Sequence, residues 1–268
     1  MSVPSSNVAQ DYLKTVYTVG EWGDARVTVS ALATRMAVSA STASETVRRL
    51  AEEGLVHHER YGGITLTEEG RHAALAMVRR HRLLETWLVE QLGYAWDEVH
   101  DEAEVLEHAV SDLLVERLDA LLGHPLRDPH GDPIPRADGT VEAPAGVPLH
   151  DVAEGEGGPV VRLSDAEPQV LRLLADAGLV LDVPVRVVER RAFAGTTVLS
   201  VGGPTAGDGR TTVAGRTAEA GRTTVAGRTA EAGRTTVAGR TAEAGRTTVA
   251  GRTVELGDPV VAAVWVGR

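Results

Sequence analysis

The sequence predicts an α+β protein with a helical N-terminal half and a small β-rich unit near its C-terminal end. Three observations support this expectation. Apolar residues recur at helical spacing through much of the first 122 residues, two β-prone runs flank a glycine turn near residue 62, and β-prone segments dominate after residue 158. A chain of 268 residues can hold two or three small domains. We expect domains over 1–72, 73–135 and 159–268, with a linker over 136–158.

The first domain follows the order helix, helix, turn, helix, hairpin. Its helices are expected over residues 8–22, 28–36 and 43–53. Hydroxyl side chains between Ser39 and Thr42 can cap the third helix, and Gly54 can end it. Two β-prone runs around Gly62-Gly63 then predict a hairpin. This order is typical of a winged helix-turn-helix domain.

The second domain is predicted to be helical, with a long helix over 68–93 and one or two more over 97–122. Five leucines near its end form an apolar stripe that is larger than one isolated helix needs: Leu113, Leu114, Leu118, Leu121 and Leu122. Ordinary packing against the preceding helix and a homodimer interface both explain this stripe. Prolines exclude a helix over residues 124–135.

The C-terminal unit is expected to be a small, mostly antiparallel barrel. Strands are predicted over 160–163, 185–190, 197–201 and 259–266, with a short helix over 167–177. A nearly perfect 12-residue repeat, Gly-Arg-Thr-Thr-Val-Ala-Gly-Arg-Thr-Ala-Glu-Ala, interrupts this unit over residues 209–256. We interpret it as a loop insertion between two strands. A hexapeptide β-solenoid is the alternative, but one valine per repeat gives it little to bury.

Composition limits the classes of function. The net charge of −11 argues against a general polyanion binder, so any DNA contact must come from a local surface. With no cysteine, the chain has neither disulfides nor thiolate metal ligands. No signal-like segment or apolar run of transmembrane length is present, which predicts a cytoplasmic protein.

A metal site is predicted where liganding side chains gather at helical spacing. His100, Glu104, Glu107 and His108 fall on one face of a helix, and we expect no lysine close to them. The pair His81 and Glu85 repeats the i,i+4 spacing one helix earlier, and Asp11 stands on the first helix. Imidazole nitrogens combined with carboxylate oxygens suit a first-row divalent ion. Alone, His81 and Glu85 would be read as a surface ion pair, and His130 as a loop histidine.

The third predicted helix offers side chains suited to DNA. Short hydroxyls at a helix N-terminus can bind phosphate or contact thymine methyl groups, and arginines can reach the backbone. The candidate contacts are Ser39, Ser41, Thr42, Ser44, Glu45, Arg48 and Arg49, with Arg60 on the wing. A trihelical core with no DNA role explains the same pattern.

Five segments of the sequence resemble the diphtheria-toxin-repressor family of metal-dependent transcriptional repressors. They are Ala9–Leu13, Ser39–Val47, Arg80–Glu85, His100–His108 and His130–Pro135. The resemblance covers residues 8–135 densely and the C-terminal unit more loosely. It implies a winged helix-turn-helix domain, a helical metal-binding and dimerisation domain, and an SH3-like (FeoA-like) barrel.

The resemblance also implies two metal sites. One is expected at Asp11, Glu104, Glu107 and His108. The second is expected at His81, Glu85 and His100, with a third-domain ligand from a stretch in which Asp165 and Glu167 are preferred over Gln169. Iron-responsive members carry Met and Cys at the positions of Asp11 and Glu104, so the two carboxylates here resemble the manganese branch, the manganese transport regulator MntR. Short members of that branch carry a further acidic ligand where this chain has Lys14, which argues against their binuclear site.

The resemblance implies a manganese-dependent repressor that acts as a homodimer on double-stranded operator DNA. Without metal, Asp11 would repel Glu104 and Glu107 and leave the DNA-binding domain loosely placed. Mn(II) would order the dimer and repress metal-uptake genes. An iron-dependent (Fe(II)) repressor and a winged-helix regulator of an organic ligand are alternatives, as is a metal buffer without a DNA role. An enzyme is not expected, because no His-Glu-x-x-His motif, nucleophile elbow or phosphate-binding glycine loop is present.

Overall fold

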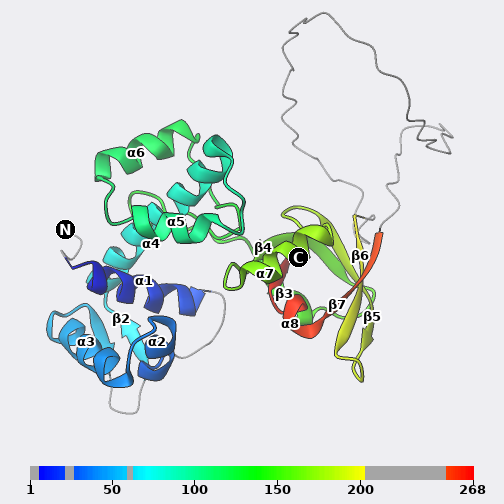
Figure 1. Cartoon of the computed structure of the whole chain (residues 1–268), viewed down its shortest axis with the longest axis horizontal. Helices are drawn as coiled ribbons and strands as arrows, with labels where there is room; N and C mark the ends of the chain where they lie inside the picture. Colours follow the sequence, from blue (N-terminus) through cyan, green and yellow to red (C-terminus); the bar gives the residue numbers. More distant parts are fainter. Residues whose placement is uncertain (1–5, 22–26, 59–62, 203–251) are drawn as a thin grey trace, which may run out of the picture.

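The computed structural model describes residues 6–21, 27–58, 63–202 and 252–268, and divides into a helical part and a β-rich part (Figure 1). Helix α1 lies between the helices α2 and α3 on one side and the helices α4 to α6 on the other. The β-rich unit follows the helical part in the chain and lies beside it. Among the described residues, no helix combines the length and apolar character needed to cross a bilayer.

The N-terminal domain has the predicted helix-turn-helix and hairpin. Its elements are α1 (Asn7–Glu21), α2 (Val29–Arg35), α3 (Ala40–Glu52), β1 (Val56–His58) and β2 (Ile64–Leu66). Leu13, Leu32 and Leu50 are fully buried in its core, and β1 pairs antiparallel with β2. Helix α3 begins at Ala40, so the predicted start at residue 43 was wrong. Ser39 is the N-cap residue, because its Oγ accepts a hydrogen bond from the Thr42 backbone N at 3.1 Å.

Three helices form the second domain: α4 (Glu68–Leu92), α5 (Val99–Leu106) and α6 (Asp112–Leu121). Helix α4 ends at Gly93, whose φ of 73° is left-handed and suits glycine. Of the predicted leucine stripe, Leu118 is buried against α4 and α5. Leu113, Leu114 and Leu121 are 62%, 45% and 63% exposed, so packing within one chain explains only part of the stripe.

The C-terminal unit is a six-stranded antiparallel sheet in the order β3-β8-β4-β5-β6-β7. Its elements are β3 (Gly146–Pro148), the 3-10 helix η1 (Leu149–Asp151), β4 (Gly157–Leu163), α7 (Pro168–Asp176), β5 (Pro184–Arg191), β6 (Thr196–Val201), β7 (Arg252–Gly257), α8 (Asp258–Val261) and β8 (Val264–Gly267). Helix α7 packs its buried leucines, Leu171 and Leu174, into the core of this sheet.

Three sequence-based boundaries in this unit were wrong. The expected linker over 136–158 contains β3 and η1, and Leu149 within it is fully buried in the core, so its second half belongs to the sheet. The expected strand over 259–266 begins as the short helix α8, because Gly257 and Pro259 favour a helix start there. The last residues of the expected insertion over 209–256 form β7, paired with β6. The rest of the repeats lies outside the described residues.

A Pro-rich turn after α6 connects the helical part to the sheet. Asp132 Oδ1 accepts a hydrogen bond from Arg162 Nε of β4 at 2.7 Å, and the His130 carbonyl accepts one from the Leu163 backbone N at 2.8 Å. The His130 ring also stacks on Trp96, with ring centroids 6.0 Å apart. These contacts bring the start of the C-terminal unit next to helices α4 and α5.

We predict that Gly70→Ala lowers the free energy of unfolding by about 2 kcal/mol. Gly70 lies in the first turn of α4, where an added Cβ would stand 1.8 Å from the Leu55 carbonyl oxygen. Gly20→Ala is the matched control, because Gly20 is also helical and nothing lies within 4 Å of its added Cβ. It should be stabilising by about 0.5 kcal/mol. Urea unfolding followed by circular dichroism measures both; equal stability of the two variants contradicts the proposed packing.

Candidate metal centres and DNA-contacting helix

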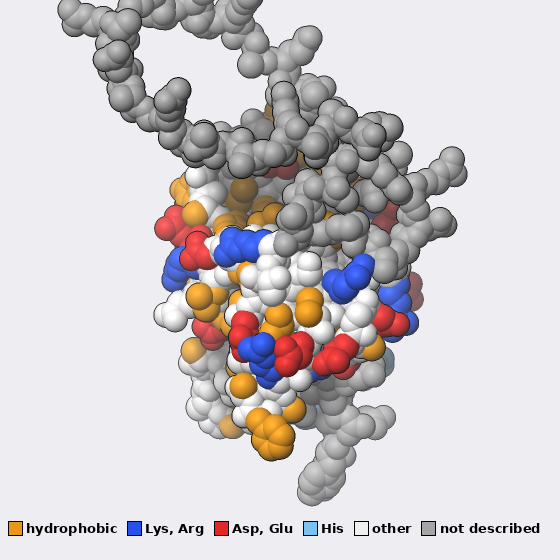
Figure 2. All heavy atoms as spheres, turned by 90° about the vertical axis from the view of Figure 1, so that its right-hand side faces the viewer, with side chains coloured by type: hydrophobic (Ala, Val, Ile, Leu, Met, Phe, Trp, Pro, Cys, Tyr) orange, Lys and Arg blue, Asp and Glu red, His pale blue; other side chains and the backbone are white. Residues whose placement is uncertain are grey.

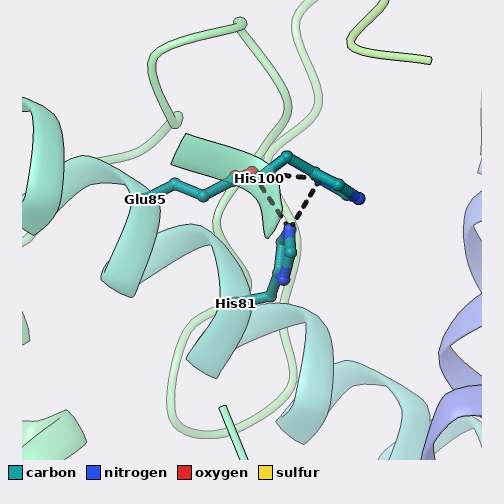
Figure 3. A group of neighbouring side chains, drawn as sticks. All are labelled: His81, Glu85 and His100. Atoms are coloured by element: carbon teal, nitrogen blue, oxygen red, sulfur yellow. Dashed lines mark hydrogen bonds and ion pairs between the residues drawn. The ribbon is translucent and has the colours of Figure 1, made fainter. Parts of the chain in front are cut away.

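The first group of potential metal ligands joins α4 to α5. His81 and Glu85 lie one turn apart on α4, and His100 faces them from α5 (Figure 3). His81 Nε2 is 3.0 Å from Glu85 Oε1 and 3.2 Å from His100 Nδ1, and His100 Nδ1 is 3.3 Å from Glu85 Oε1. Ligand atoms of the three residues all lie within 4.8 Å of one another. The resemblance to the repressor family implied a metal site at these same three residues, and the structure brings them together.

Protonated imidazoles are favoured in this first group. Burial alone would lower the pKa of His81, but Glu85 and Glu107 raise it to about 9. Burial likewise opposes protonation of His100, and Asp165 together with Glu85 raises its pKa to about 10. A metal ligand must be a neutral imidazole, so a cation entering this group has to displace protons.

A second group joins α1 to the end of α5. His108 Nε2 lies 2.8 Å from Asp11 Oδ1 and 3.6 Å from Glu107 Oε1. The other ring nitrogen, His108 Nδ1, donates to Gln10 Oε1 at 2.8 Å. That hydrogen bond leaves Nε2 facing the two carboxylates, the arrangement in which a histidine can bind a metal. Of the four residues that the resemblance implied for this site, Asp11, Glu107 and His108 therefore lie together. We call them the α1–α5 group.

The fourth expected residue, Glu104, is paired with Lys14 instead. Lys14 Nζ lies 2.6 Å from Glu107 Oε1 and 3.1 Å from Glu104 Oε1, and the lysine is 8% exposed. Burial lowers the pKa of Lys14, but the two glutamates outweigh it and raise the pKa above its ordinary value. The expectation of no nearby lysine was wrong. The i,i+3 spacing from Asp11 on α1 was the signal that could have placed Lys14 here.

Glu107 connects the two groups. Its carboxylate is fully buried, and its Oε2 accepts a hydrogen bond from His81 Nδ1 at 2.6 Å while Oε1 faces Lys14 and His108. Burial raises the pKa of Glu107, but the hydrogen bond from His81 and the charge of Lys14 hold it below its ordinary value. Glu107 therefore also fixes the His81 ring, with Nε2 directed at Glu85 and His100.

A third group was not expected from the sequence. Glu85, Asp128 and His130 are all buried, with ligand atoms within 4.8 Å of one another. His130 Nε2 donates to the Trp96 carbonyl oxygen at 2.6 Å, whereas its buried Nδ1 has no hydrogen-bond partner. Burial, Asp132 and Glu85 raise the pKa of Asp128 to about 8. The interpretation of His130 as a surface loop histidine was wrong, because the Pro-rich turn folds inward and is covered by the C-terminal unit.

The sequence predicts a further metal ligand from Asp165 or Glu167 of the C-terminal unit, and one of these two residues lies at the first group. Asp165 Oδ2 lies 3.3 Å from His100 Nδ1, at the edge of the first group. Burial raises the pKa of Asp165, but the hydrogen bond from His100 holds it well below its usual range. Glu167 is exposed at the N-terminus of α7 and belongs to none of the three groups, so its role as a ligand stays a prediction.

These groups fit a divalent ion of the hard or borderline class. All of the potential ligand atoms are imidazole nitrogens and carboxylate oxygens, the set that Mn²⁺, Fe²⁺ and similar ions accept. The buried Nδ1 of His130 has no hydrogen-bond partner, although the neighbouring Asp128 carboxyl already accepts hydrogen bonds from the His130 and Asp132 backbone N atoms, so Nδ1 is the nitrogen of this group that is open to a cation. The geometry therefore supports metal binding where α1, α4, α5 and the Pro-rich turn meet.

The predicted DNA-contacting side chains lie on the outer face of α3. Ser39, Ser41, Thr42, Ser44, Glu45, Arg48 and Arg49 are all exposed. Ser39 Oγ contacts the hydroxyls of Ser41 and Thr42 at 2.8 Å each, and Arg48 pairs with Glu52 at 2.6 Å. Arg60 lies outside the described residues. On the face of the C-terminal unit seen in Figure 2, basic and acidic side chains of the described residues are intermixed and do not gather into one basic patch.

Comparison with known protein families assigns all three parts of the chain. Residues 5–64 match the iron dependent repressor N-terminal DNA binding domain. Residues 67–136 match the iron dependent repressor metal binding and dimerisation domain, and residues 147–207 match the FeoA domain.

Relatives match over long segments. The diphtheria toxin repressor of Corynebacterium glutamicum is 33% identical over 190 residues, which cover 67% of this chain and 83% of that protein. The iron-dependent repressor IdeR of Mycobacterium tuberculosis is 40% identical over 124 residues, or 46% of this chain and 54% of that protein.

Two solved structures match nearly the whole chain. One is a manganese-dependent transcriptional repressor in complex with manganese (TM-score 0.76, 48% identity, 97% of this chain and 99% of that one). The other is ScaR with bound Cd²⁺ (TM-score 0.69, 27% identity, with the same coverage). This chain therefore belongs to the diphtheria toxin repressor family of metal-dependent transcriptional repressors.

Proposed function

We propose that this protein is a manganese-dependent transcriptional repressor that binds operator DNA as a homodimer. The observation that carries the proposal is the group formed by Asp11, Glu107 and His108, since it connects the first helix of the DNA-binding domain to the end of α5. A cation held there acts on the placement of the DNA-binding domain. Repression of metal-uptake genes when the ion is plentiful follows as the physiological role.

The donor set is the reason for proposing manganese. None of the three groups of potential ligands contains a sulfur atom. Asp11, Glu85 and Glu107 supply hard oxygens, which favours Mn²⁺ relative to softer ions. A 48% identical structure is that of a manganese-dependent repressor with manganese, whereas the curated relatives include iron-dependent repressors. Fe²⁺ is therefore the second candidate, and both ions belong in every binding experiment.

The proposed ligands follow the geometry. Asp11, Glu107 and His108 would hold one ion, and Glu104 would join them by giving up its contact with Lys14. His81, Glu85, His100 and Asp165 would hold another ion. Asp128 and His130 also lie close to Glu85, so these two residues could bind the ion in place of His81 and His100. A bound divalent ion would supply the positive charge that these carboxylates otherwise take from Lys14 and from protonated imidazoles.

Docking of α1 is the step that the ligands would control. Glu21 at the end of α1 already pairs with the buried Arg82 of α4 at 2.5 Å. Asp11 and Gln10 contact His108 near the other end of α1. A metal ion bound by Asp11, Glu107 and His108 would strengthen this second contact and so stabilise the orientation of α3, whose exposed residues would contact operator DNA in the cytoplasm.

The exposed leucines of α6 are the proposed homodimer surface. Leu113, Leu114 and Leu121 are unusually exposed for large apolar side chains, and they lie within the segment that matches a dimerisation domain. A dimer places two α3 helices to read two half-sites of one operator.

We predict that Asp11→Asn and His108→Ala each weaken Mn²⁺ binding at the α1–α5 group by roughly 100-fold. Asp101→Asn is the matched control, since Asp101 is an exposed carboxylate of α5 outside all three groups. Equilibrium dialysis measures uptake of Mn²⁺ and of Fe²⁺. Gel shifts on fragments selected from a random library by the wild-type protein with Mn²⁺ measure DNA binding. If both variants take up as much metal as wild type, the assigned ligands are excluded. If the wild-type protein binds DNA more tightly with Fe²⁺ than with Mn²⁺, an iron-dependent repressor is favoured.

Metal binding should release protons and tighten as the pH rises. The pKa values of about 9 for His81 and about 10 for His100 keep both imidazoles charged at neutral pH. Each proton displaced strengthens apparent metal affinity by up to about tenfold per pH unit between pH 7 and 9. Calorimetry in buffers of different ionisation enthalpy counts the protons released on Mn²⁺ binding, and His100→Gln should release fewer. The same proton count in His100→Gln and wild type contradicts the assignment.

We expect Arg49→Ala to weaken DNA binding about tenfold and to reduce the salt dependence of the affinity by about one counterion, because Arg49 is an exposed cation on α3. Arg191→Ala is the control, since Arg191 is an exposed arginine on β5 of the C-terminal unit. Fluorescence anisotropy at several salt concentrations measures both variants. If Arg191→Ala has the larger effect, the DNA surface has been misplaced.

A further inference from the structure

Lys14 is the one lysine of the 268-residue sequence; the other 26 of its 27 lysine and arginine residues are arginines. It is also nearly buried and lies among the proposed ligands of the α1–α5 group. An ammonium ion in such a place costs desolvation free energy, so its ion pairs have to offset that cost. Because Lys14 is buried, it does not serve to keep the protein surface soluble, and its position needs another explanation.

The ammonium and a metal ion would need the same oxygen atoms. Glu107 Oε1, which lies 2.6 Å from Lys14 Nζ, is the oxygen that faces His108 Nε2 at 3.6 Å. Glu104 Oε1, 3.1 Å from Lys14 Nζ, belongs to the residue expected to complete the ligand set. Lys14 thus engages two carboxylates that would otherwise be available to a cation.

Lysine suits a contact that has to be reversible. Its ammonium is a compact point charge on a flexible four-carbon stem, whereas the guanidinium of arginine is a rigid fork that binds carboxylates through two parallel hydrogen bonds. The two ion pairs also run from α1 to Glu104 on α5 and to Glu107 just after it, so they hold α1 in place when no metal is bound. This differs from the repulsion between Asp11 and the two glutamates that the sequence led us to expect.

On the basis of the proposed function, we propose that Lys14 is a built-in competitor of the metal. Its ammonium occupies Glu104 and Glu107 in the metal-free protein, docks α1 on the α5 end of the helical domain, and sets the metal concentration at which the group fills. Loss of its charge has two separable consequences. The metal binds more tightly, and the metal-free contact of α1 becomes weaker.

Lys14→Met tests the proposal, because methionine keeps much of the length and apolar character of the side chain and removes its charge. We expect this variant to bind Mn²⁺ at least tenfold more tightly in equilibrium dialysis, since a cation adjacent to the site is lost. In the metal-free state, amide hydrogen exchange in the N-terminal half of α1 should be faster than in wild type. Arg191→Met removes a distant positive charge and should change neither measurement. Lys14→Arg keeps the charge and binds the two carboxylates at least as firmly, so it should bind Mn²⁺ no more tightly than wild type.

A purely structural lysine gives a different result. Its removal would disorder Glu104 and Glu107 and leave Mn²⁺ affinity equal to or weaker than that of wild type. That outcome, in a Lys14→Met protein with wild-type circular dichroism, overturns the proposal while leaving the proposed function intact. Absence of Mn²⁺ and Fe²⁺ uptake by wild type and all variants overturns both.

The single lysine also permits a direct observation. Protein labelled with ¹³C at lysine Cε should give one side-chain signal, and titration with diamagnetic Cd²⁺ should shift that signal in proportion to occupancy of the α1–α5 group. The signal should not shift in the Asp11→Asn protein under the same conditions. A signal that stays fixed while wild type binds Cd²⁺ through Asp11 shows that Lys14 keeps its contacts, which contradicts competition.

Discussion

The Glu107 carboxylate is fully buried, and charged or protonatable partners contact both of its oxygens. Oε1 faces Lys14 of α1 and His108, while Oε2 accepts a hydrogen bond from His81 of α4. Because a buried carboxylate is strongly destabilised without such partners, the α1, α4 and α5 contacts depend on one another. We therefore expect a change in charge at one partner of Glu107 to weaken its contacts with the other partners as well.

The C-terminal unit closes the other side of this arrangement. Asp165 reaches His100, and the Pro-rich turn places the buried His130 and Asp128 beside Glu85. Glu85 therefore belongs to both the first and the third group, whereas Glu107 connects the first group to the second. The sheet domain is thus part of the proposed metal-binding centre, and on this proposal its docking and the docking of α1 would respond to the same ions. Protonated imidazoles and one ammonium ion balance the charge of the carboxylates in the metal-free state, and the proposal is that a bound metal would replace these cations.

Local patterns in the sequence predicted most of the fold and much of the candidate site. Helical spacing was sufficient for α1, α4 and the i,i+4 pair His81 and Glu85, because these features depend on neighbours within one helix. The resemblance to the family then placed Asp11 with Glu107 and His108, which the structure brings together. The family and fold are confirmed, whereas the metal ligands themselves remain proposals.

What the sequence missed depends on contacts between distant segments. His130 looked like a loop histidine because the sheet that buries it lies about 30 residues further along the chain. Lys14 pairs with residues about 90 positions away; its i,i+3 spacing from Asp11 placed it on the same face of α1, but its ion pairs with Glu104 and Glu107 depend on the packing of α1 against α5. The start of the sheet at Gly146 was hidden by a Gly-, Pro- and acid-rich composition that is also typical of linkers.

Mutual tightening of metal and DNA binding is the central claim of this account, and thermodynamic linkage tests it without any substitution. The measurement is the Mn²⁺ affinity of the wild-type protein alone and when saturated with a DNA fragment that it selects in the presence of Mn²⁺. The account predicts tighter Mn²⁺ binding in the DNA complex, by the same factor by which Mn²⁺ strengthens DNA binding. Equal Mn²⁺ affinity of the free and DNA-bound protein would contradict it.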